Sequence, residues 1–307
     1  MPGVAKTIRI GTRDSELALW QAHKVQGELE ALGYQTELLP VKSSGDLILD
    51  KPLYELGITG IFTKTLDVAM LQGTIDIAVH SMKDVPTALP KGIVEAAVLE
   101  RANTKDLLVH KGLDFLEGPG GLIATGSLRR KAQWLHKYPT HQTTDLRGNV
   151  NTRMQKLNDS DWNGAIFAAA GLERINLKPE QAIELDWMIP APAQGAMLVV
   201  AMENDLFCKE ALAELNDKNT ALAVGIERDF LKTLEGGCTA PIGALATIKN
   251  GAVCFEGALF SLDGKEKIAV NKTIPIEDAK GFGVTCAQEV LKNGGREMMA
   301  GIKAELQ

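Results

Sequence analysis

The feature that most constrains the fold is an alternation of short apolar runs with longer helical stripes. Residues 6–11 alternate like a strand, residues 14–32 carry an apolar stripe at spacings of three and four, and residues 36–42 form a second strand-like run. A strand, a helix and a strand in this order favour a parallel sheet. The same pattern resumes near Thr104 and continues to about residue 169. We therefore predict an α/β fold with two sheets.

The pattern changes in the last third of the chain. A helical run over residues 219–234 precedes three strand-like runs at 242–248, 253–260 and 267–274. Asn250-Gly251 and Asp263-Gly264 separate these runs and are typical of hairpins. Helical segments at 278–292 and 295–306 follow. This region predicts a small α+β domain with an antiparallel three-stranded sheet covered by helices.

A chain of 307 residues is longer than one hydrophobic core usually supports. The proline-bearing segment 189–195 is interpreted as a linker, and the apolar run 196–202 as a strand that returns to one of the two sheets. We predict two lobes like those of periplasmic binding proteins, with a cleft that closes on a ligand. The predicted domains are 1–100 with 194–216, then 101–193, then 217–307.

Composition excludes several functional classes. A net charge of -6 argues against general binding of nucleic acid. The N-terminus lacks the apolar run of a signal peptide, and no run approaches the ~20 apolar residues that cross a bilayer. Four cysteines show no metal-ligand spacing and histidines are scattered. We therefore expect a cytoplasmic protein with reduced thiols, no metal and no membrane partner.

Charged residues follow the predicted strands directly. Lys83 and Asp84 come just after the strand predicted at 75–80. Ligands of open α/β sheets bind beyond the carboxyl ends of strands, so this position favours a functional site. The alternative is a surface turn with a solvated ion pair.

In the second α/β region, each predicted strand is followed by arginine. Single arginines are usually surface residues, but a repeated placement at one edge of a sheet favours a shared anion site. The residues are Arg129 and Arg130 after 121–125, Arg147 after 142–146, Arg153 on the next helix, and Arg174 after 164–169.

The segment Glu235-Gly236-Gly237-Cys238 ends the helical run of residues 219–234. Two glycines free the backbone and remove side chains that would shield the thiol, and Pro241 fixes the exit of the loop. The pattern indicates a thiol to which a group is attached or which attacks one. The alternative is a helix C-cap followed by a small buried cysteine.

Taken together, six segments resemble the hydroxymethylbilane synthases, a family also called porphobilinogen deaminases. They extend from the N-terminal strand to the third-domain sheet, and all six occur in order. The segments are Thr12-Arg13 with Ser15 and residues 17–22, residues 76–86 (DIAVHSMKDVP), residues 126–130 (GSLRR), residues 146–150 (LRGNV), residues 170–174 (AGLER) and residues 234–238 (LEGGC).

This resemblance implies a transferase of porphyrin and haem biosynthesis that joins four porphobilinogen molecules head to tail into hydroxymethylbilane, releasing ammonia. It implies one dipyrromethane cofactor on a thioether to Cys238, and a catalytic Asp84 that stabilises cationic intermediates and handles protons. It also implies a monomer. The cofactor-binding residues would be Lys83, Ser127, Arg129, Arg130, Arg147, Gly148, Asp46 and Gln194, and the substrate-binding residues Arg13, Ser15, Arg153, Arg174 and Phe62.

The charges agree with this implication. Each porphobilinogen unit carries an acetate and a propionate, so a growing chain is a dense polyanion that arginine forks match well. The sequence departs from the family at Ser44 and Thr59, where basic residues are common, within the predicted lid 43–60. Ala193 replaces a glycine and Ala240 a β-branched residue. None of these changes removes an essential group.

Two other functions fit parts of the sequence. A solute-binding protein without catalytic activity would share the two-lobed fold, but would have no use for a thiol on a third domain. A thiol enzyme with Cys238 as nucleophile would need a histidine or cation lowering its pKa. No histidine lies near Cys238 in the sequence.

Overall fold

The computed structural model describes residues 6–41, 63–235 and 240–306, which form two compact units. The first unit holds residues 6–41, 63–102 and 195–221, and the second holds residues 103–194, 222–235 and 240–306. Asp46, Phe62, Cys238 and the whole predicted lid (43–60) lie outside the described residues. Within the described part, no helix is long and apolar enough to cross a bilayer, and no cluster of metal-ligating side chains occurs.

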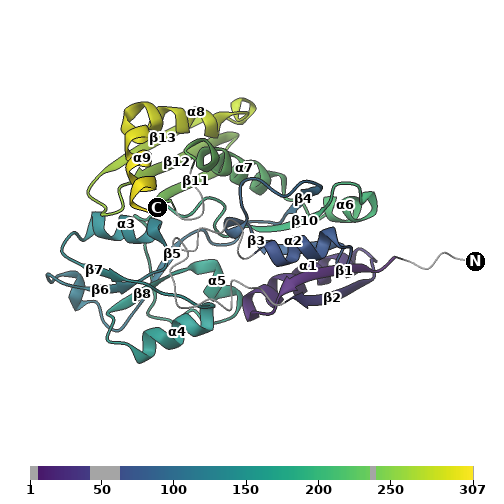
Figure 1. The fold of residues 1–307 in the computed structure, drawn as a ribbon, viewed down its shortest axis with the longest axis horizontal. Helices are drawn as coiled ribbons and strands as arrows, with labels where there is room; N and C mark the ends of the chain where they lie inside the picture. The colour runs from purple at the N-terminus through teal and green to yellow at the C-terminus, as the bar shows by residue number, and fades with distance from the viewer. Residues whose placement is uncertain (1–5, 42–62, 236–239, 307) are drawn as a thin grey trace, which may run out of the picture. The chain divides into compact units, whose positions relative to one another are not determined.

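The first unit is built on a five-stranded sheet with strand order β2-β1-β3-β10-β4. Strands β1, β2 and β3 are parallel, whereas β10 runs antiparallel to both of its neighbours, β3 and β4. The elements are β1 (Ile8–Arg13), α1 (Glu16–Ala31), β2 (Thr36–Val41), α2 (Lys64–Leu71), β3 (Ile77–Ser81), a 3₁₀ turn (Met82–Asp84), β4 (Ile93–Val98), β10 (Met197–Met202) and α6 (Leu206–Ala213) (Figure 1).

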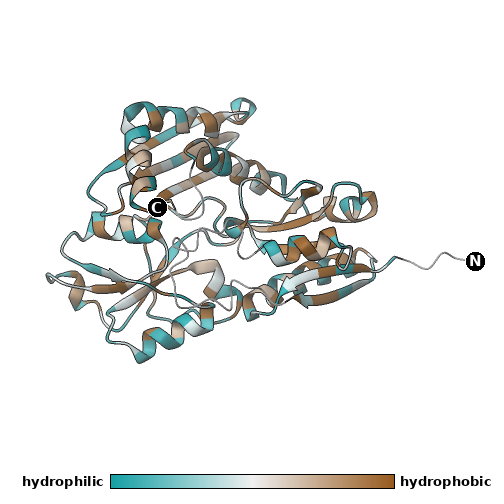
Figure 2. Cartoon of the chain, in the orientation of Figure 1, coloured by the Kyte–Doolittle hydropathy of each residue, from teal (hydrophilic) through white to brown (hydrophobic). Residues whose placement is uncertain are grey.

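Alternation along the strands gives this sheet two apolar faces. One face packs against α1 and α6 in a single buried cluster that includes Ile10, Val25, Val79 and Cys208. Gly11 alternates with Ile10 on β1 and therefore belongs to the opposite face, where a Cβ at Gly11 would lie 3.2 Å from Leu66 of α2. Strand β10 is hydrophobic along its whole length, as expected for a central strand covered on both sides (Figure 2).

The second unit contains a sheet of the same design, with order β7-β6-β8-β5-β9. Strands β6, β7 and β8 are parallel, and β5 lies antiparallel between β8 and β9. The elements are β5 (Asp106–His110), β6 (Leu122–Ala124), α3 (Leu128–Lys137), β7 (Gln142–Thr144), α4 (Val150–Asp159), β8 (Gly164–Ala168), α5 (Ala169–Arg174) and β9 (Ile183–Glu184).

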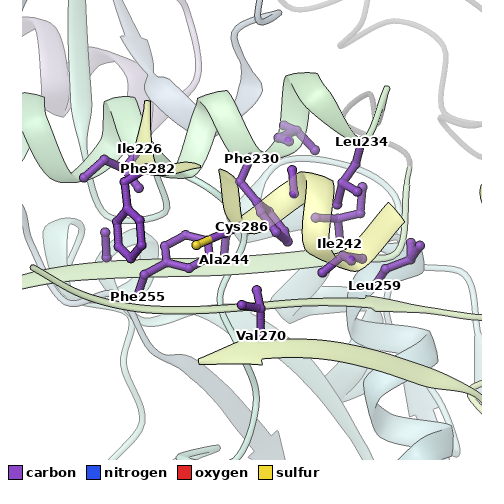
Figure 3. Close-up of a cluster of buried hydrophobic side chains, with 14 of the residues drawn as sticks. Ile226, Phe230, Leu234, Ile242, Ala244, Phe255, Leu259, Val270, Phe282 and Cys286 are labelled. Carbon is purple, nitrogen blue, oxygen red and sulfur yellow. The ribbon is translucent and has the colours of Figure 1, made fainter. Parts of the chain in front are cut away.

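The C-terminal part of the second unit is an antiparallel meander of β11 (Ile242–Lys249), β12 (Ala252–Phe260) and β13 (Lys267–Pro275). Helices α7 (Lys218–Thr233) and α8 (Phe282–Val290) bury one face of it, and α9 (Arg296–Glu305) completes the layer. Figure 3 shows Phe230 of α7 and Cys286 of α8 directed onto Phe255 of the sheet. The Phe230 and Phe255 rings pack edge to face, with their centroids 5.1 Å apart.

The meander packs against α3, and this contact explains why the two parts form one unit. Ala132 of α3 shares a buried cluster with Phe260 of β12. Gly264, in the turn before β13, has a φ of +74°, and a Cβ there would lie 2.4 Å from the Ala132 carbonyl oxygen. His136 hydrogen-bonds the Gly264 carbonyl at 2.7 Å through Nδ1. Only glycine therefore fits this turn against the helix.

The predicted α/β class and the three-stranded antiparallel sheet are confirmed, and residues 196–202 do return to the first sheet as β10. Strands β4, β5 and β9 and helices α5 and α6 are additions to the sequence prediction. The helix predicted at 278–292 begins only at Phe282, because Gly281 takes a left-handed φ of +75° and breaks it.

Candidate functional site

A pocket in the first unit lies at the carboxyl ends of β1 and β3. It brings together three residues predicted from the sequence, Arg13, Ser15 and Asp84, with Gln21 and His80, which were not predicted. Lys83 lies beside Asp84 in the 3₁₀ turn. The remaining lining residues are Leu17, Ala18, Thr63, Val79 and Ser81.

Two side-chain hydrogen bonds hold the ends of β1 and β3 against α1 beside this pocket. Thr12, at the end of β1, is fully buried and donates from Oγ1 to the Ala18 carbonyl at 3.0 Å. Gln21 of α1 donates from Nε2 to Ser81 Oγ, at the end of β3, at 2.9 Å. These bonds tie both strand ends to the first turns of α1. Arg13 and Ser15 are therefore held at the edge of the sheet on a short connection.

Asp84 is presented by a rigid turn with apolar anchors. Met82 and Val85 are buried, and Met82 N donates to the carbonyl of Ala196, just before the antiparallel strand β10. The Val85 N–H closes the turn on the Met82 carbonyl at 3.1 Å. Lys83 and Asp84 stay partly exposed between these anchors. The local sequence thus buries the ends of the turn and leaves the charged pair accessible.

His80 is the buried titratable group of the pocket. Its side chain is 6% exposed, and burial, together with the positive charge of Arg13, lowers its pKa to about 4. The ring is therefore neutral at physiological pH. The sequence showed His80 only as the last residue of a predicted strand, which gave no sign that it would line a pocket.

The second unit presents its arginines at the equivalent edge, at the carboxyl ends of β6, β7 and β8. Gly126 allows the first two of these strand ends to approach closely, since a Cβ there would lie 2.6 Å from the Leu146 carbonyl oxygen. Ser127 caps α3 by accepting a hydrogen bond from Arg130 N at 3.4 Å. The predicted helix start after β6 is therefore confirmed, and Arg129 and Arg130 occupy its first turn.

A buried aspartate holds both arginines. Asp106 is fully buried, and its Oδ2 pairs with Arg129 Nη1 at 2.7 Å. Its Oδ1 accepts from Arg130 Nε at 2.9 Å and pairs with Arg130 Nη2 at 2.8 Å. Burial alone would raise the pKa of Asp106, but the two guanidinium charges outweigh it and hold that pKa well below its usual range. Burial lowers the pKa of Arg129, and Asp106 opposes that shift.

Backbone carbonyls complete the support of the two guanidinium groups. Arg130 Nη1 donates to the Ile166 carbonyl at 3.0 Å, and Arg129 Nη1 donates to the Ile189 carbonyl at 2.8 Å. All three nitrogens of Arg130 are thereby engaged. Arg129 Nε, in contrast, is buried and meets no hydrogen-bond partner among residues 6–41, 63–235 and 240–306.

Further along the edge, Gly148 follows Arg147 and supports the side chain of Arg153. This glycine has a φ of +114°, and its carbonyl accepts from Arg153 Nε at 2.7 Å. Asn149 then caps α4 by accepting from Thr152 N at 2.9 Å. Burial lowers the pKa of Arg147. Burial also lowers the pKa of Arg174, at the end of α5, to about 10, although Glu173 opposes it.

Gln194 lies in the linker and joins it to the start of β5. Its Nε2 donates to the Thr104 carbonyl at 2.8 Å and to Asp106 Oδ1 at 3.0 Å. The preceding Ala193 has a positive φ of 62° and donates its N–H to Glu227 Oε2 at 2.6 Å. The other oxygen of Glu227 accepts from Ala246 N at 2.7 Å. A buried carboxylate therefore fixes the linker to β11.

Two family profiles match this sequence. One is described as porphobilinogen deaminase, dipyromethane cofactor binding domain, and covers residues 8–238; the other is the porphobilinogen deaminase C-terminal domain and covers residues 221–292. The chain belongs to the porphobilinogen deaminase family. It is a transferase that polymerises porphobilinogen into hydroxymethylbilane and carries a dipyrromethane cofactor.

Curated relatives agree over nearly the full length. The porphobilinogen deaminase of Geotalea uraniireducens is 41% identical over 96% of this chain and 94% of its own. That of Syntrophotalea carbinolica is 40% identical over 97% of this chain and 96% of its own. A solved methionine binding protein, MetQ, matches 72% of this chain and 94% of its own at 14% identity with a TM-score of 0.46, which adds nothing to the assignment.

The residues of the second unit fit a dipyrromethane. The group carries carboxylate side chains, and the edge supplies forked cationic donors on short, internally supported connections. Arg129 Nε is a buried donor that still lacks a hydrogen bond within the described part. The donor set is therefore suited to carboxylates, whereas it would be a poor site for an apolar or cationic group.

Proposed function

We propose that porphobilinogen binds and reacts in the pocket of the first unit, with Asp84 as the catalytic carboxylate. The observation that supports this most directly is that Asp84 and Arg13 line one pocket, at the strand ends where open α/β sheets bind ligands. Arg13, with Ser15, would bind the acetate and propionate of the substrate. Asp84 would stabilise positive charge on the substrate as ammonia leaves and would accept the proton that the coupling releases.

The second unit is proposed to hold the carboxylates of the cofactor. Ser127, Arg129, Arg130, Arg147, Gly148 and Gln194 are assigned to cofactor binding, as are Lys83 and Asp46, whereas Arg153, Arg174 and Phe62 are assigned to substrate. When bound, the dipyrromethane supplies the pyrrole carbon to which the new units are added. The protein's own part is to neutralise carboxylates and keep the growing chain oriented.

Cys238 is proposed as the anchor of the cofactor. The supporting observation is that the described cysteines make poor alternatives. Cys208 and Cys286 are buried, and burial raises their pKa values to about 12 and about 11, so their thiolates are disfavoured. Cys254 lies within β12, on the sheet that forms a core. The remaining candidate is Cys238, which follows two glycines in the sequence.

The intact mass of the purified protein tests this assignment. After incubation with porphobilinogen, the wild-type chain should exceed the bare polypeptide by one dipyrromethane. Cys238→Ser should give the bare mass, whereas the matched control Cys254→Ser should still load. A bare mass for the wild type, or loading of Cys238→Ser, would contradict the assignment.

The domain limits predicted from the sequence, a monomeric state and a cytoplasmic location complete the proposal. Nucleic acid is not expected as a partner, because the net charge of -6 gives no general attraction for phosphates. Light scattering of the loaded protein during size-exclusion chromatography should give the mass of one chain. A dimer mass would remove the monomer from the proposal and leave the site assignments intact.

A further inference from the structure

His80 differs from the other polar groups around the pocket. Strand alternation directs Val79 and Ser81 to the face covered by α1, where Ser81 accepts a hydrogen bond from Gln21. His80 points to the other face and lines the pocket together with Arg13 and Asp84. Its side chain is 6% exposed, so most of the ring is covered by protein and the exposed remainder borders the pocket. A polar ring that borders a pocket can exchange a hydrogen bond with a ligand there.

Its electrostatic surroundings define what that partner can be. Burial and the charge of Arg13 keep the ring neutral, so one nitrogen is a donor and the other an acceptor. The other charged groups that line the pocket are Arg13 and Asp84. Arg13 suits the carboxylates of porphobilinogen. The aminomethyl group of the substrate, an ammonium at neutral pH, needs acceptors.

We propose that His80 is a substrate-binding residue, whose unprotonated ring nitrogen accepts a hydrogen bond from the aminomethyl ammonium of porphobilinogen. This rests on the proposed function of the pocket. Two acceptors, the Asp84 carboxylate and the His80 ring, would then hold the leaving group. When the carbon–nitrogen bond breaks, its electron pair stays with nitrogen, ammonia leaves and the positive charge remains on the substrate. His80 takes up no proton in this step.

The neutral state of His80 matters for that role. A protonated ring would add a second positive charge beside Arg13 and would offer only donors. It would therefore repel both the ammonium and the cation that follows. A neutral ring in the same place binds the ammonium without competing with Asp84 for positive charge.

The test compares porphobilinogen with an analogue in which a methyl group replaces the aminomethyl group. Loaded, full-length wild type, His80→Leu and His80→Gln are assayed for kcat and KM, and for inhibition by the analogue. His80→Leu should lower kcat/KM for porphobilinogen about 10- to 100-fold, the loss expected for a hydrogen bond to a charged group. The inhibition constant of the analogue should stay within about twofold, because the analogue has no ammonium. His80→Gln, which keeps an acceptor, should recover most of the loss.

The analogue also gives a readout that is independent of turnover. Its stabilisation of the loaded protein against heat should be the same in wild type and His80→Leu. Equal weakening of porphobilinogen and the analogue by His80→Leu would show a merely structural role and overturn the proposal. Failure of the analogue to inhibit or stabilise the wild type would instead count against the pocket itself.

Discussion

The two α/β sheets share one strand order but differ in the charged residues at the edge where their parallel strands end. In each sheet an antiparallel strand lies beside the last parallel strand, and its first residue pairs with the end of that neighbour. In the first unit this pair is Met197 with Ser81, and in the second it is Asp106 with Ala168. The first unit therefore has an apolar residue where the second has a carboxylate.

Because Met197 stands in the first unit where Asp106 stands in the second, the second unit pairs two arginines at this edge with a buried carboxylate. Asp106 neutralises Arg129 and Arg130 inside the second unit, so that edge is ordered before any ligand arrives. The first unit has no acid at the equivalent position, and its Arg13 and Asp84 border a pocket. Preorganised cations suit a permanently bound cofactor, and an accessible carboxylate suits a substrate that turns over.

Arg130→Met should have the largest effect, because it removes one cation from the buried network around Asp106. Removing one partner of a buried charge network should lower the free energy of unfolding by about 3–5 kcal/mol, because Asp106 loses part of its compensation. Urea unfolding followed by circular dichroism measures the change. The double variant Asp106→Asn with Arg130→Met should cost less than the sum of the single changes. Additive losses would show that the pair acts independently.

Asp84→Asn probes the open site. The amide keeps the shape of the side chain but loses the charge, so kcat should fall about 10²- to 10³-fold, the usual loss for one electrostatic contributor at an active site. The unfolding temperature should stay within a few degrees of wild type, because Asp84 is partly exposed. Near-normal turnover of loaded Asp84→Asn would refute the catalytic role.

His80 predicts a pH dependence for the first unit. Its pKa of about 4 in the folded protein lies below the ~6.5 of an unfolded chain, so the unfolded state binds more protons as pH falls. The contribution to stability is present above pH ~6.5 and is lost as pH drops toward 4. Between pH 7 and pH 5 the loss should be about 2 kcal/mol.

Urea unfolding of wild type and His80→Gln at both pH values isolates this contribution. The free energy of unfolding of wild type minus that of His80→Gln should fall by about 2 kcal/mol between pH 7 and pH 5, because the glutamine does not titrate. The carboxylate of Asp106 serves as the contrast: its depressed pKa stabilises the fold above the unfolded value near 4, so its loss begins only at lower pH. A pH-independent difference would contradict the buried neutral histidine.

The sequence located the groups that follow strands and missed those placed by pairing between distant segments. Asp84 and the arginines were found because strand ends and helix starts are local patterns, and parallel strands bring their ends to one edge. Asp106 begins an apolar run, and a carboxylate there could have been suspected of burial. Its arrival at the arginines depends on β5 running antiparallel to β8, which no local pattern specifies.

Gln194 and His80 show the same limit. Gln194 follows a turn in the linker, and its contact with Asp106 requires that the linker pass the start of β5. His80 was visible as a strand residue, but its burial beside Arg13 and Asp84 depends on the segments that pack around it. The sequence therefore predicts which residues lie at the carboxyl ends of the strands. Which opposite charges they pair with depends on tertiary contacts between distant segments.

Ala193→Gly should have the smallest effect. It tests the left-handed backbone of the linker residue that precedes Gln194. Alanine at a φ of 62° is strained by about 1–2 kcal/mol, whereas glycine adds roughly 0.5–1 kcal/mol of entropy to the unfolded chain. The net change should be a stabilisation of at most about 1.5 kcal/mol, since the N–H bond to Glu227 is kept. Thermal unfolding measures it, with the exposed Gly27→Ala change on α1 as the opposite control, where alanine is the better helix former. A lower unfolding temperature for Ala193→Gly would mean that the left-handed linker is held by more than its hydrogen bond, and that the second unit uses alanine's methyl group to keep its charge network in place.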